Sequence, residues 1–524
     1  MTPEQFVRSL HADSYEPVSP LEQVDWSDAP LAYKLYRGLP VIPLCAEVPL
    51  SESGGIRSGS ELDAIGYMLW YAYGISRVDQ YRSNAVEGLA YEPMQSYRRF
   101  VPSGGGLYPN ELYIYLRTTE APAGIYHYDA AHHRLSLLRE GLFDSCISQA
   151  LGNRCDVSQC TGVVLVSVMF WKNVFKYHEF AYRLQGLDTG VLIGQLLEST
   201  RRFGFETGVC LQFLDRALHH LLGLDEQEES VYAVIPFSTR PAASWFQRTV
   251  AGEGNADAAE LSRELPAVRH EHYVRSQNIK PYPLLARMNE AAMHASTAAF
   301  RCAGALRHRD PGAQAVYLPF GGRRPRDFFA YCRMRQSPEA DFVLRLVPLQ
   351  DLAALLQETV GSAQVRTDLT PPDGPAAPRL SLYCTVYHVE GVADGAYRYD
   401  AAAHMLRRVR AGDHRTRLQA GMTMDNVNLY QVPLCFHVAG ERDYGMRELG
   451  PRGYRIQQME AGMLVHRLLL AASDAGMGGR PLLGYAPSVI DELYRLGDQG
   501  TTALIQIPVG PYRGRPRLEG SLRG

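Results

Sequence analysis

Lysine is nearly missing from this chain of 524 residues. Its 53 lysines and arginines comprise 49 arginines and only four lysines, at Lys34, Lys172, Lys176 and Lys280. With 56 acidic residues the net charge is −3, so there is no overall basic field of the kind that nucleic-acid-binding proteins carry. Such an arginine bias is typical of a GC-rich genome, and it makes each remaining lysine a candidate for a specific role.

Long apolar runs and paired cysteines are absent as well. No segment approaches the roughly 18 consecutive apolar residues that a membrane helix needs. The first 17 residues lack the apolar core of a signal peptide. The nine cysteines are scattered and odd in number, which argues against a disulfide framework, and no cysteine or histidine cluster has the spacing of a metal site. We therefore expect a soluble, cytoplasmic protein with no membrane or nucleic-acid partner and no metal.

The composition is otherwise that of an ordinary globular protein. Hydrophobic residues make up 46% and charged residues 21%, which excludes a mainly disordered or collagen-like chain. At about 150 residues per domain, the length suggests two to four domains.

The chain contains an internal repeat. The segment GIYHYDAAHHRL, which begins at Gly124, recurs as GAYRYDAAAHML from Gly395, at an offset of 271 residues. The segment YRLQ at Tyr182 recurs as YRIQ at Tyr454, at an offset of 272 residues. The second offset is also kept by Gly190 and Gly462, Leu192 and Leu464, Leu196 and Leu468, Gly204 and Gly476, and Pro236 and Pro508. Such similarity indicates two copies of one domain, each of roughly 240 residues.

The repeat predicts the domain boundaries. Copy one is expected to span residues 1–250 and copy two residues 280–524. Residues 251–279 are expected to be a linker, because the first half of this segment is rich in Gly, Ala and acidic side chains. Residues kept in both copies, among them Tyr128 and Asp129, are expected to form turns and core rather than to carry chemistry.

Hydrophobic spacing predicts helices and strands in both copies. Apolar residues recur at helical intervals over Glu61–Tyr73, Tyr182–Arg202, Leu349–Glu358 and Tyr454–Ser473. Strands are predicted at Glu111–Arg117, Gly162–Phe170, Val231–Phe237, Arg379–Val389, Tyr430–Val438 and Thr502–Val509. Strands interleaved with long helices indicate an α+β fold.

The most distinctive segment is Pro102-Ser-Gly-Gly-Gly-Leu-Tyr-Pro109. Three glycines after a serine, just before a predicted strand, allow close approach to the backbone and expose amide N–H groups. The segment is not a phosphate-binding Walker loop, because no Lys-Ser/Thr pair follows it, and it is not a dinucleotide fingerprint, because it precedes a strand. A simple glycine turn is the alternative interpretation.

This segment resembles a motif of the SagB/McbC-type azoline dehydrogenases. The similarity extends over Pro-Ser-Gly-Gly-Gly-Leu-Tyr-Pro-x-Glu (102–111), Gly-Ile-Tyr-His-Tyr-Asp (124–129) and the pair Lys176-Tyr177 ahead of Tyr182-Arg183. It spans most of copy one and, more weakly, copy two. It implies a nitroreductase-like α+β fold with FMN as cofactor, and two tandem copies that form an intramolecular pseudo-dimer.

The resemblance also implies which residues contact FMN. In this family FMN lies between two subunits, one of which supplies a glycine loop and the other an arginine-rich motif. The glycine loop of copy one would supply Pro102, Ser103, Gly104 and Gly105. Copy two would supply Arg323, Arg324 and Arg326 to the phosphate, Gly478, Gly479 and Leu482 beside the flavin ring, and Arg515 and Arg517 near the C-terminus.

Arginine forks suit the geometry and charge of a phosphate, although an exposed basic patch is the alternative. In copy two the counterpart of the glycine loop, residues 371–378, lacks both the serine and the triple glycine. The resemblance therefore implies one complete, composite FMN site and one degenerate site.

Lys176 and Tyr177 are the catalytic pair that the resemblance implies. Their counterparts in copy two are Glu448 and Leu449, so the chemistry is expected in copy one alone. A lysine can act as a base where burial or a nearby cation lowers its pKa, and a tyrosine can assist by hydrogen bonding. An ion-paired surface lysine beside a packing tyrosine is the alternative.

The predicted activity is oxidation of a peptidyl thiazoline or oxazoline to a thiazole or oxazole in peptide natural-product biosynthesis. The substrate would be a ribosomal peptide or a carrier-bound azoline, a cyclodehydratase or carrier protein would be a partner, and oxygen would reoxidise the flavin. One alternative is an NAD(P)H-dependent flavin reductase of a nitro or dehydroamino-acid substrate. Another is a non-catalytic scaffold of a biosynthetic complex. Whether the pseudo-dimer pairs again as a homodimer stays open.

Overall fold

The computed structural model forms two compact units, which we describe one at a time. The copy-one unit comprises residues 17–300 and 366–372, and the copy-two unit comprises residues 1–16, 301–365 and 373–524. Within them the structure describes residues 1–13, 24–51, 59–82, 93–240, 246, 255–304, 306, 314–321, 327–361, 365–370 and 378–514.

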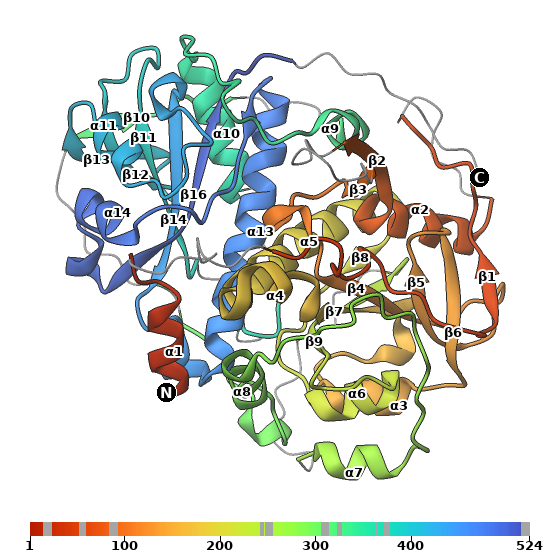
Figure 1. Cartoon of the computed structure of the whole chain (residues 1–524). Helices are drawn as coiled ribbons and strands as arrows, with labels where there is room; N and C mark the ends of the chain where they lie inside the picture. Colours follow the sequence, from red (N-terminus) through yellow and green to blue (C-terminus); the bar gives the residue numbers. More distant parts are fainter. Residues whose placement is uncertain are drawn as a thin grey trace, which may run out of the picture. The chain divides into compact units, whose positions relative to one another are not determined.

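Each unit contains a seven-stranded antiparallel sheet, and the strands follow the same order in both (Figure 1). In the copy-one unit the order is β1 (Val41–Pro43), β6 (Arg134–Glu140), β5 (Gly124–Asp129), β4 (Asn110–Leu116), β7 (Gly162–Met169), β9 (Glu229–Ser238) and β8 (Glu206–Thr207). In the copy-two unit it is β10 (Ala315–Tyr317), β13 (Met405–Ala411), β12 (Gly395–Asp400), β11 (Ser381–Val386), β14 (Leu434–Glu441), β16 (Thr501–Gly510) and β15 (Gly478–Gly479). The matching order confirms the duplication that the repeat predicted.

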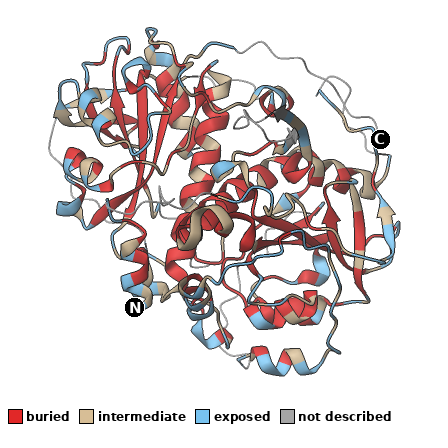
Figure 2. Cartoon of the chain, in the orientation of Figure 1, coloured by how far each residue is buried: buried red, intermediate tan, exposed pale blue. Residues whose placement is uncertain are grey.

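One long helix packs against each sheet. These helices are α5 (Ala181–Arg202) and α13 (Arg452–Asp474), and most of their residues are buried (Figure 2). Each contacts a second helix that follows the edge strand β1 or β10 in the sequence, α2 (Glu61–Tyr73) or α10 (Leu349–Gly361). Each is followed by a glycine with positive φ, Gly204 at 85° and Gly476 at 68°, a conformation that glycine adopts most easily after a helix.

Shorter helices complete the units. The copy-one unit contains α3 (Asp144–Ala150), α4 (Trp171–Tyr177), α6 (Asp215–Leu222), α7 (Ala258–Arg263) and α8 (Pro283–Ala291). The copy-two unit contains α1 (Pro3–Ser9), α9 (Phe328–Met334), α11 (Arg415–Ala420), α12 (Met446–Leu449) and α14 (Pro487–Tyr494).

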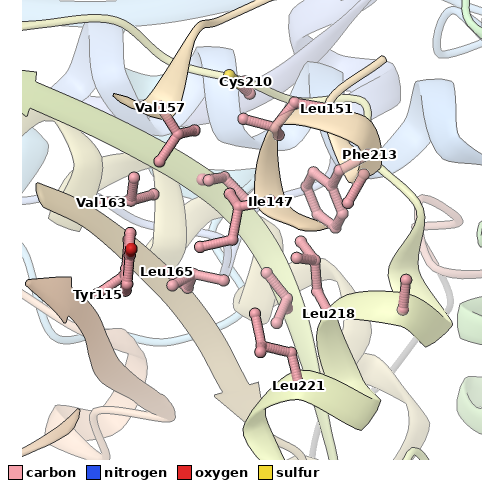
Figure 3. Packing of buried hydrophobic residues seen from close by; sticks show 14 of the residues in the cluster. Tyr115, Ile147, Leu151, Val157, Val163, Leu165, Cys210, Phe213, Leu218 and Leu221 are labelled. Carbon is pink, nitrogen blue, oxygen red and sulfur yellow. The ribbon is translucent and has the colours of Figure 1, made fainter. Parts of the chain in front are cut away.

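One face of the copy-one sheet packs against α3 and α6. Alternate residues of a strand point to the same face, so Tyr115, Val163 and Leu165 lie together there (Figure 3). Ile147 of α3 and Leu218 of α6 pack on them and are fully buried. Full burial of each such aliphatic side chain stabilises the fold by about 1.5–3 kcal/mol.

The repeated turn after β5 and β12 serves the fold, as its presence in both copies predicted. The Tyr128 hydroxyl lies 2.9 Å from His133 Nδ1, and the Tyr399 hydroxyl lies 2.8 Å from His404 Nδ1. Both histidines have a φ of 48°. The structure thus confirms this turn as a structural element.

The copy-one unit includes residues beyond 250, and the predicted domain boundaries at 250 and 280 stay a prediction. The α7 and α8 helices, which follow residue 250, belong to the copy-one unit. The reason is that Ala258 and Leu261 of α7 are buried in the same core as the sheet and α6.

Each unit also includes a short segment from the other half of the chain. The N-terminal helix α1 belongs to the copy-two unit, where His11 Nε2 lies 3.1 Å from the hydroxyl of Tyr454. Residues 366–372 belong to the copy-one unit. No helix in the described part of either unit is long and apolar enough to cross a membrane.

Candidate functional site

The glycine loop of copy one joins a two-stranded hairpin to the central strand of the sheet. The hairpin consists of β2 (Ile75–Arg82) and β3 (Pro93–Arg99), and β4 begins at Asn110, directly after the loop. Gly104–Gly106 form a short 3-10 turn in which Gly105 has a φ of 65° and Gly106 a φ of 69°. These left-handed angles favour glycine over any residue with a side chain.

Close neighbours also exclude side chains from the loop. A Cβ atom at Gly104 would lie 2.7 Å from Leu184 Cδ2 on α5, and one at Gly105 would lie 2.6 Å from the Tyr177 hydroxyl. Both distances are shorter than real Cβ contacts. The loop therefore packs tightly on α4 and α5, and a side chain at either position would have to displace Leu184 or Tyr177.

Asp188 of α5 binds the start of the loop. Ser103 Oγ donates to Asp188 Oδ2 over 2.5 Å, and the Gly104 amide donates to Asp188 Oδ1 over 3.1 Å. The Tyr108 amide in turn donates to Ser103 Oγ over 2.9 Å. Burial raises the pKa of Asp188 to about 7, although these hydrogen bonds oppose the rise.

Tyr177 lies at the C-terminal end of α4, with its hydroxyl against Gly105. Burial raises its pKa to about 12, and the charge of Asp188 adds to the effect. The phenol is therefore protonated at neutral pH and is able to donate a hydrogen bond.

Lys176 lies beside aromatic rings rather than carboxylates. Its Nζ is 5.4 Å from the centroid of the Trp26 ring and 4.9 Å from that of Tyr177. Burial lowers the pKa of Lys176, and no carboxylate in the described part of the chain forms an ion pair with it. Its neutral form is therefore more accessible than that of an ordinary surface lysine.

The other two lysines of this region are fully buried and ion-paired. Lys34 Nζ lies 2.7 Å from Glu229 Oε2, and Lys172 pairs with Glu111, the glutamate of the glycine-loop motif. Burial alone would raise the pKa of Glu111, but the charges and hydrogen bonds of Lys172 and His127 lower it by more. The net pKa is below its usual range, and the carboxyl is ionised. These pairs are structural, which sets Lys176 apart.

The copy-one sequence that builds this geometry matches a known family model. Residues 63–237 match the Nitroreductase family, and this stretch includes the glycine loop, α4 and α5. This stretch, a third of the chain, is similar to the Nitroreductase family.

Two further comparisons agree with this assignment. A protein of Methanocaldococcus jannaschii classed as a nitroreductase is 26% identical over 164 residues, which cover 31% of this chain and 80% of that protein. The crystal structure of a protein from Anabaena variabilis, also classed as a nitroreductase, superposes with a TM-score of 0.73 at 19% identity. That match covers 98% of this chain and 100% of the other, so the nitroreductase-like fold extends through both copies.

The microcin synthetase complex of Escherichia coli with truncated pro-MccB17 bound matches 39% of this chain and 68% of its own matched chain. The identity is 18% and the TM-score 0.27, and we base nothing on this similarity.

In the copy-one unit, the structure brings five of the predicted residues into one region. Gly104 and Gly105 contact α5 and α4, Ser103 reaches Asp188, and Tyr177 lies against Gly105 with Lys176 next to it. Pro102, which precedes Ser103, is half-buried. Whether these residues hold a cofactor or act on a substrate stays a prediction.

The three residues predicted near the flavin ring lie at a packed edge of the copy-two sheet. A Cβ at Gly478 would lie 2.7 Å from Tyr512, and one at Gly479 would lie 2.6 Å from Leu469. The Leu482 amide donates to the backbone oxygen of Gln506 over 2.8 Å. Packing within the unit thus already explains both glycines.

The predicted phosphate-binding arginines cannot be placed. Arg323, Arg324, Arg326, Arg515 and Arg517 lie outside the described residues. Their role stays a prediction.

Two residues at the loop were missed by the sequence analysis. Asp188 binds Ser103 and Gly104. The guanidinium of Arg98 lies beside Gly106, and its Nε donates to Asp79 over 3.1 Å. Arg98 stands four residues before the motif, which is a local signal. Asp188 lies 84 residues from Gly104, so only the folded chain places it there.

Proposed function

We propose that this chain is an FMN-dependent oxidoreductase that oxidises a peptidyl thiazoline or oxazoline to the corresponding azole. The observation that carries the proposal is the contact between Gly105 and the Tyr177 hydroxyl, with Lys176 beside it. It joins the glycine loop to the lysine–tyrosine pair within one nitroreductase-family domain. The sequence resemblance to azoline dehydrogenases supplies the substrate class.

The loop is suited to a flavin. Gly105 is exposed, and its amide has no hydrogen-bond acceptor among the described residues. A free amide on a backbone without side chains can contact the polar edge or ribityl chain of FMN closely. Arg98, beside Gly106, adds a positive charge next to the loop. We assign Ser103, Gly104, Gly105 and Arg98 to the protein side of this contact.

Bound FMN would supply a hydride acceptor for the reaction. Conversion of an azoline to an azole also removes a proton from the neighbouring ring carbon, and this proton needs a base. Lys176 Nζ takes it in its neutral form, which burial makes more accessible. The protonated phenol of Tyr177 donates a hydrogen bond that orients the substrate.

The aromatic surroundings of Lys176 serve the same step. Trp26 and Tyr177 are within cation–π range of Nζ, so they stabilise the ammonium that forms when the proton arrives. A carboxylate at this place would keep the lysine charged permanently and so prevent it from acting as a base.

The reductase alternative has one point in its favour. The matched family and both relatives carry the name nitroreductase. An NAD(P)H-dependent reductase would not need a substrate base, so it gives no role to an unpaired Lys176. That residue makes the dehydrogenase the better-supported proposal.

Anaerobic reduction of the flavin-loaded full chain distinguishes the two activities. We expect a thiazoline peptide to bleach the flavin absorbance and NADPH alone to leave it unchanged. Rapid bleaching by NADPH, with none from the peptide, would overturn the dehydrogenase in favour of the reductase. A chain that takes up no FMN would overturn both and leave the scaffold.

A further inference from the structure

Asp188 is a buried carboxyl whose hydrogen-bond partners among the described residues are neutral groups. Its side chain is 8% exposed, and it accepts hydrogen bonds from the Ser103 hydroxyl and the Gly104 amide. No lysine or arginine contributes to its pKa shift. Buried carboxylates are normally paired with a cation, because loss of hydration otherwise disfavours the charge. An arrangement without a cation therefore needs a reason.

Copy two shows the usual solution at the same place. The residue 272 positions after Asp188 is Glu460, on the corresponding helix α13. Its carboxylate forms a two-pronged ion pair with Arg379, and the Arg379 Nε contact is 3.1 Å. Copy two has no triple glycine, and the acid at this position is paired with an arginine. In copy one the acid at this position accepts hydrogen bonds from the glycine loop instead.

We propose that Asp188 is a positioning residue of copy one, which fixes the glycine loop so that the Gly105 amide is presented to a ligand. The carboxylate holds Ser103 and Gly104, and Ser103 Oγ then accepts from the Tyr108 amide. Both ends of the 3-10 turn are thereby tied to one side chain. The ligand class, a flavin mononucleotide, rests on the proposed function.

This role makes the loop sensitive to pH. The titratable groups around Asp188 are Tyr177 on α4 and Tyr73 on α2, and its charge raises the pKa of both. The pKa of each phenol is higher than that of Asp188, so only the carboxyl changes charge near neutral pH. An ionised carboxylate accepts both hydrogen bonds strongly, whereas a protonated one loses the charge that strengthens them.

Hydrogen exchange on the full chain without added FMN tests the positioning role. In Asp188→Ala we expect the Gly104 and Tyr108 amides to exchange about tenfold faster or more than in the wild type, because charge-assisted bonds are lost. Asp188→Asn keeps the size and shape of the side chain. In this variant the exchange rates should increase less, and they should depend on pH only as the intrinsic exchange rate does. The matched control is Glu460→Gln, which should leave both amides unchanged.

A second readout separates this inference from the proposed function. FMN affinity, measured by quenching of flavin fluorescence, should rise in the wild type as pH increases from 6 to 8 and stay flat in Asp188→Asn. A wild type that binds no FMN would defeat the proposed function, while the exchange data still decide the role of Asp188. Unchanged loop exchange in both Asp188 variants would overturn the positioning role, whatever the affinity for FMN.

Discussion

The hydroxyl of Tyr177 occupies the space that a side chain at Gly105 would need. A Cβ there would lie 2.6 Å from that hydroxyl, and the φ of 65° already disfavours any other residue. The two residues lie 72 positions apart in sequence, on the glycine loop and on α4. Their contact is the point at which the cofactor and catalytic motifs of the resemblance meet.

Gly105→Ala should destabilise the chain and weaken FMN binding, because strain and the clash with Tyr177 add together. We expect a loss of about 2–3 kcal/mol in the free energy of unfolding, measured in urea. Gly38→Ala is the control, since Gly38 has a φ of 64° with open space around it, and should cost about 1 kcal/mol. Tyr177→Phe should recover part of the difference in a double-mutant cycle, and additive effects would contradict the clash.

Lys176 and Lys172, one helical turn apart on α4, should respond in opposite ways to alanine. Lys176→Ala should abolish substrate oxidation, keep the flavin colour and change stability by less than about 1 kcal/mol. Lys172→Ala should cost about 3–5 kcal/mol, because it removes the lysine that neutralises the buried Glu111 and leaves His127 beside this carboxylate. Turnover by the Lys176 variant at the wild-type rate would exclude it as the base.

The rate should also depend on pH through Lys176. Because burial lowers the pKa of this amine, oxidation should increase with pH and level off below the usual lysine value of 10.5. The profile should be measured as kcat/KM against pH at saturating oxygen. A rate that falls as the pH rises from 6 to 8 would rule out a neutral amine as the proton acceptor.

Asp188→Asn should make the protein more stable at pH 8 but not at acidic pH. The pKa of Asp188 in the fold, about 7, is above its ordinary value of 3.8, so the fold loses stability as pH rises through 7, because the cost of burying the charge exceeds what the stronger loop hydrogen bonds return. The asparagine avoids this loss, and the gain at pH 8 should be about 2–4 kcal/mol. Glu460→Gln should have the opposite sign at pH 8, because it breaks an ion pair. Urea midpoints at pH 5 and pH 8 measure both effects.

Arg326→Ala should weaken FMN retention if the arginine cluster of copy two binds the phosphate. We expect about a tenfold rise in the dissociation constant, measured by equilibrium dialysis. The double variant of Arg515 and Arg517 is the comparison. An effect confined to that double variant would move the phosphate contact to the C-terminal arginines.

Much of the fold could be predicted from the sequence because its signals are local or repeated. The helix Glu61–Tyr73 is found with the predicted ends, since Ser60 caps it and its apolar residues recur at helical spacing. The long helices and the buried strands are also present, with ends that differ by a few residues. The duplication was visible because the two copies keep the same turns.

The site could be predicted only in part. Ser103, Gly104, Gly105, Lys176 and Tyr177 carry local motifs, and the fold brings them together. Asp188, which accepts hydrogen bonds from Ser103 and Gly104, belongs to no motif, and an acid stands at the same position in copy two. The structural use of Gly478 and Gly479 depends on Tyr512 and Leu469, which are distant or cross-strand contacts that spacing does not reveal.

Residues 366–372 follow the first repeat in the sequence but form part of the copy-one unit. Asp368 accepts hydrogen bonds from the Leu211 and Gln212 amides of the copy-one unit, each over 2.9 Å, and is 4% exposed. A chain shortened to the first repeat would lack the carboxylate that accepts from these two amides. Removal of the segment that carries Asp368 should therefore destabilise the copy-one unit, so the first repeat depends on residues that follow it in the chain.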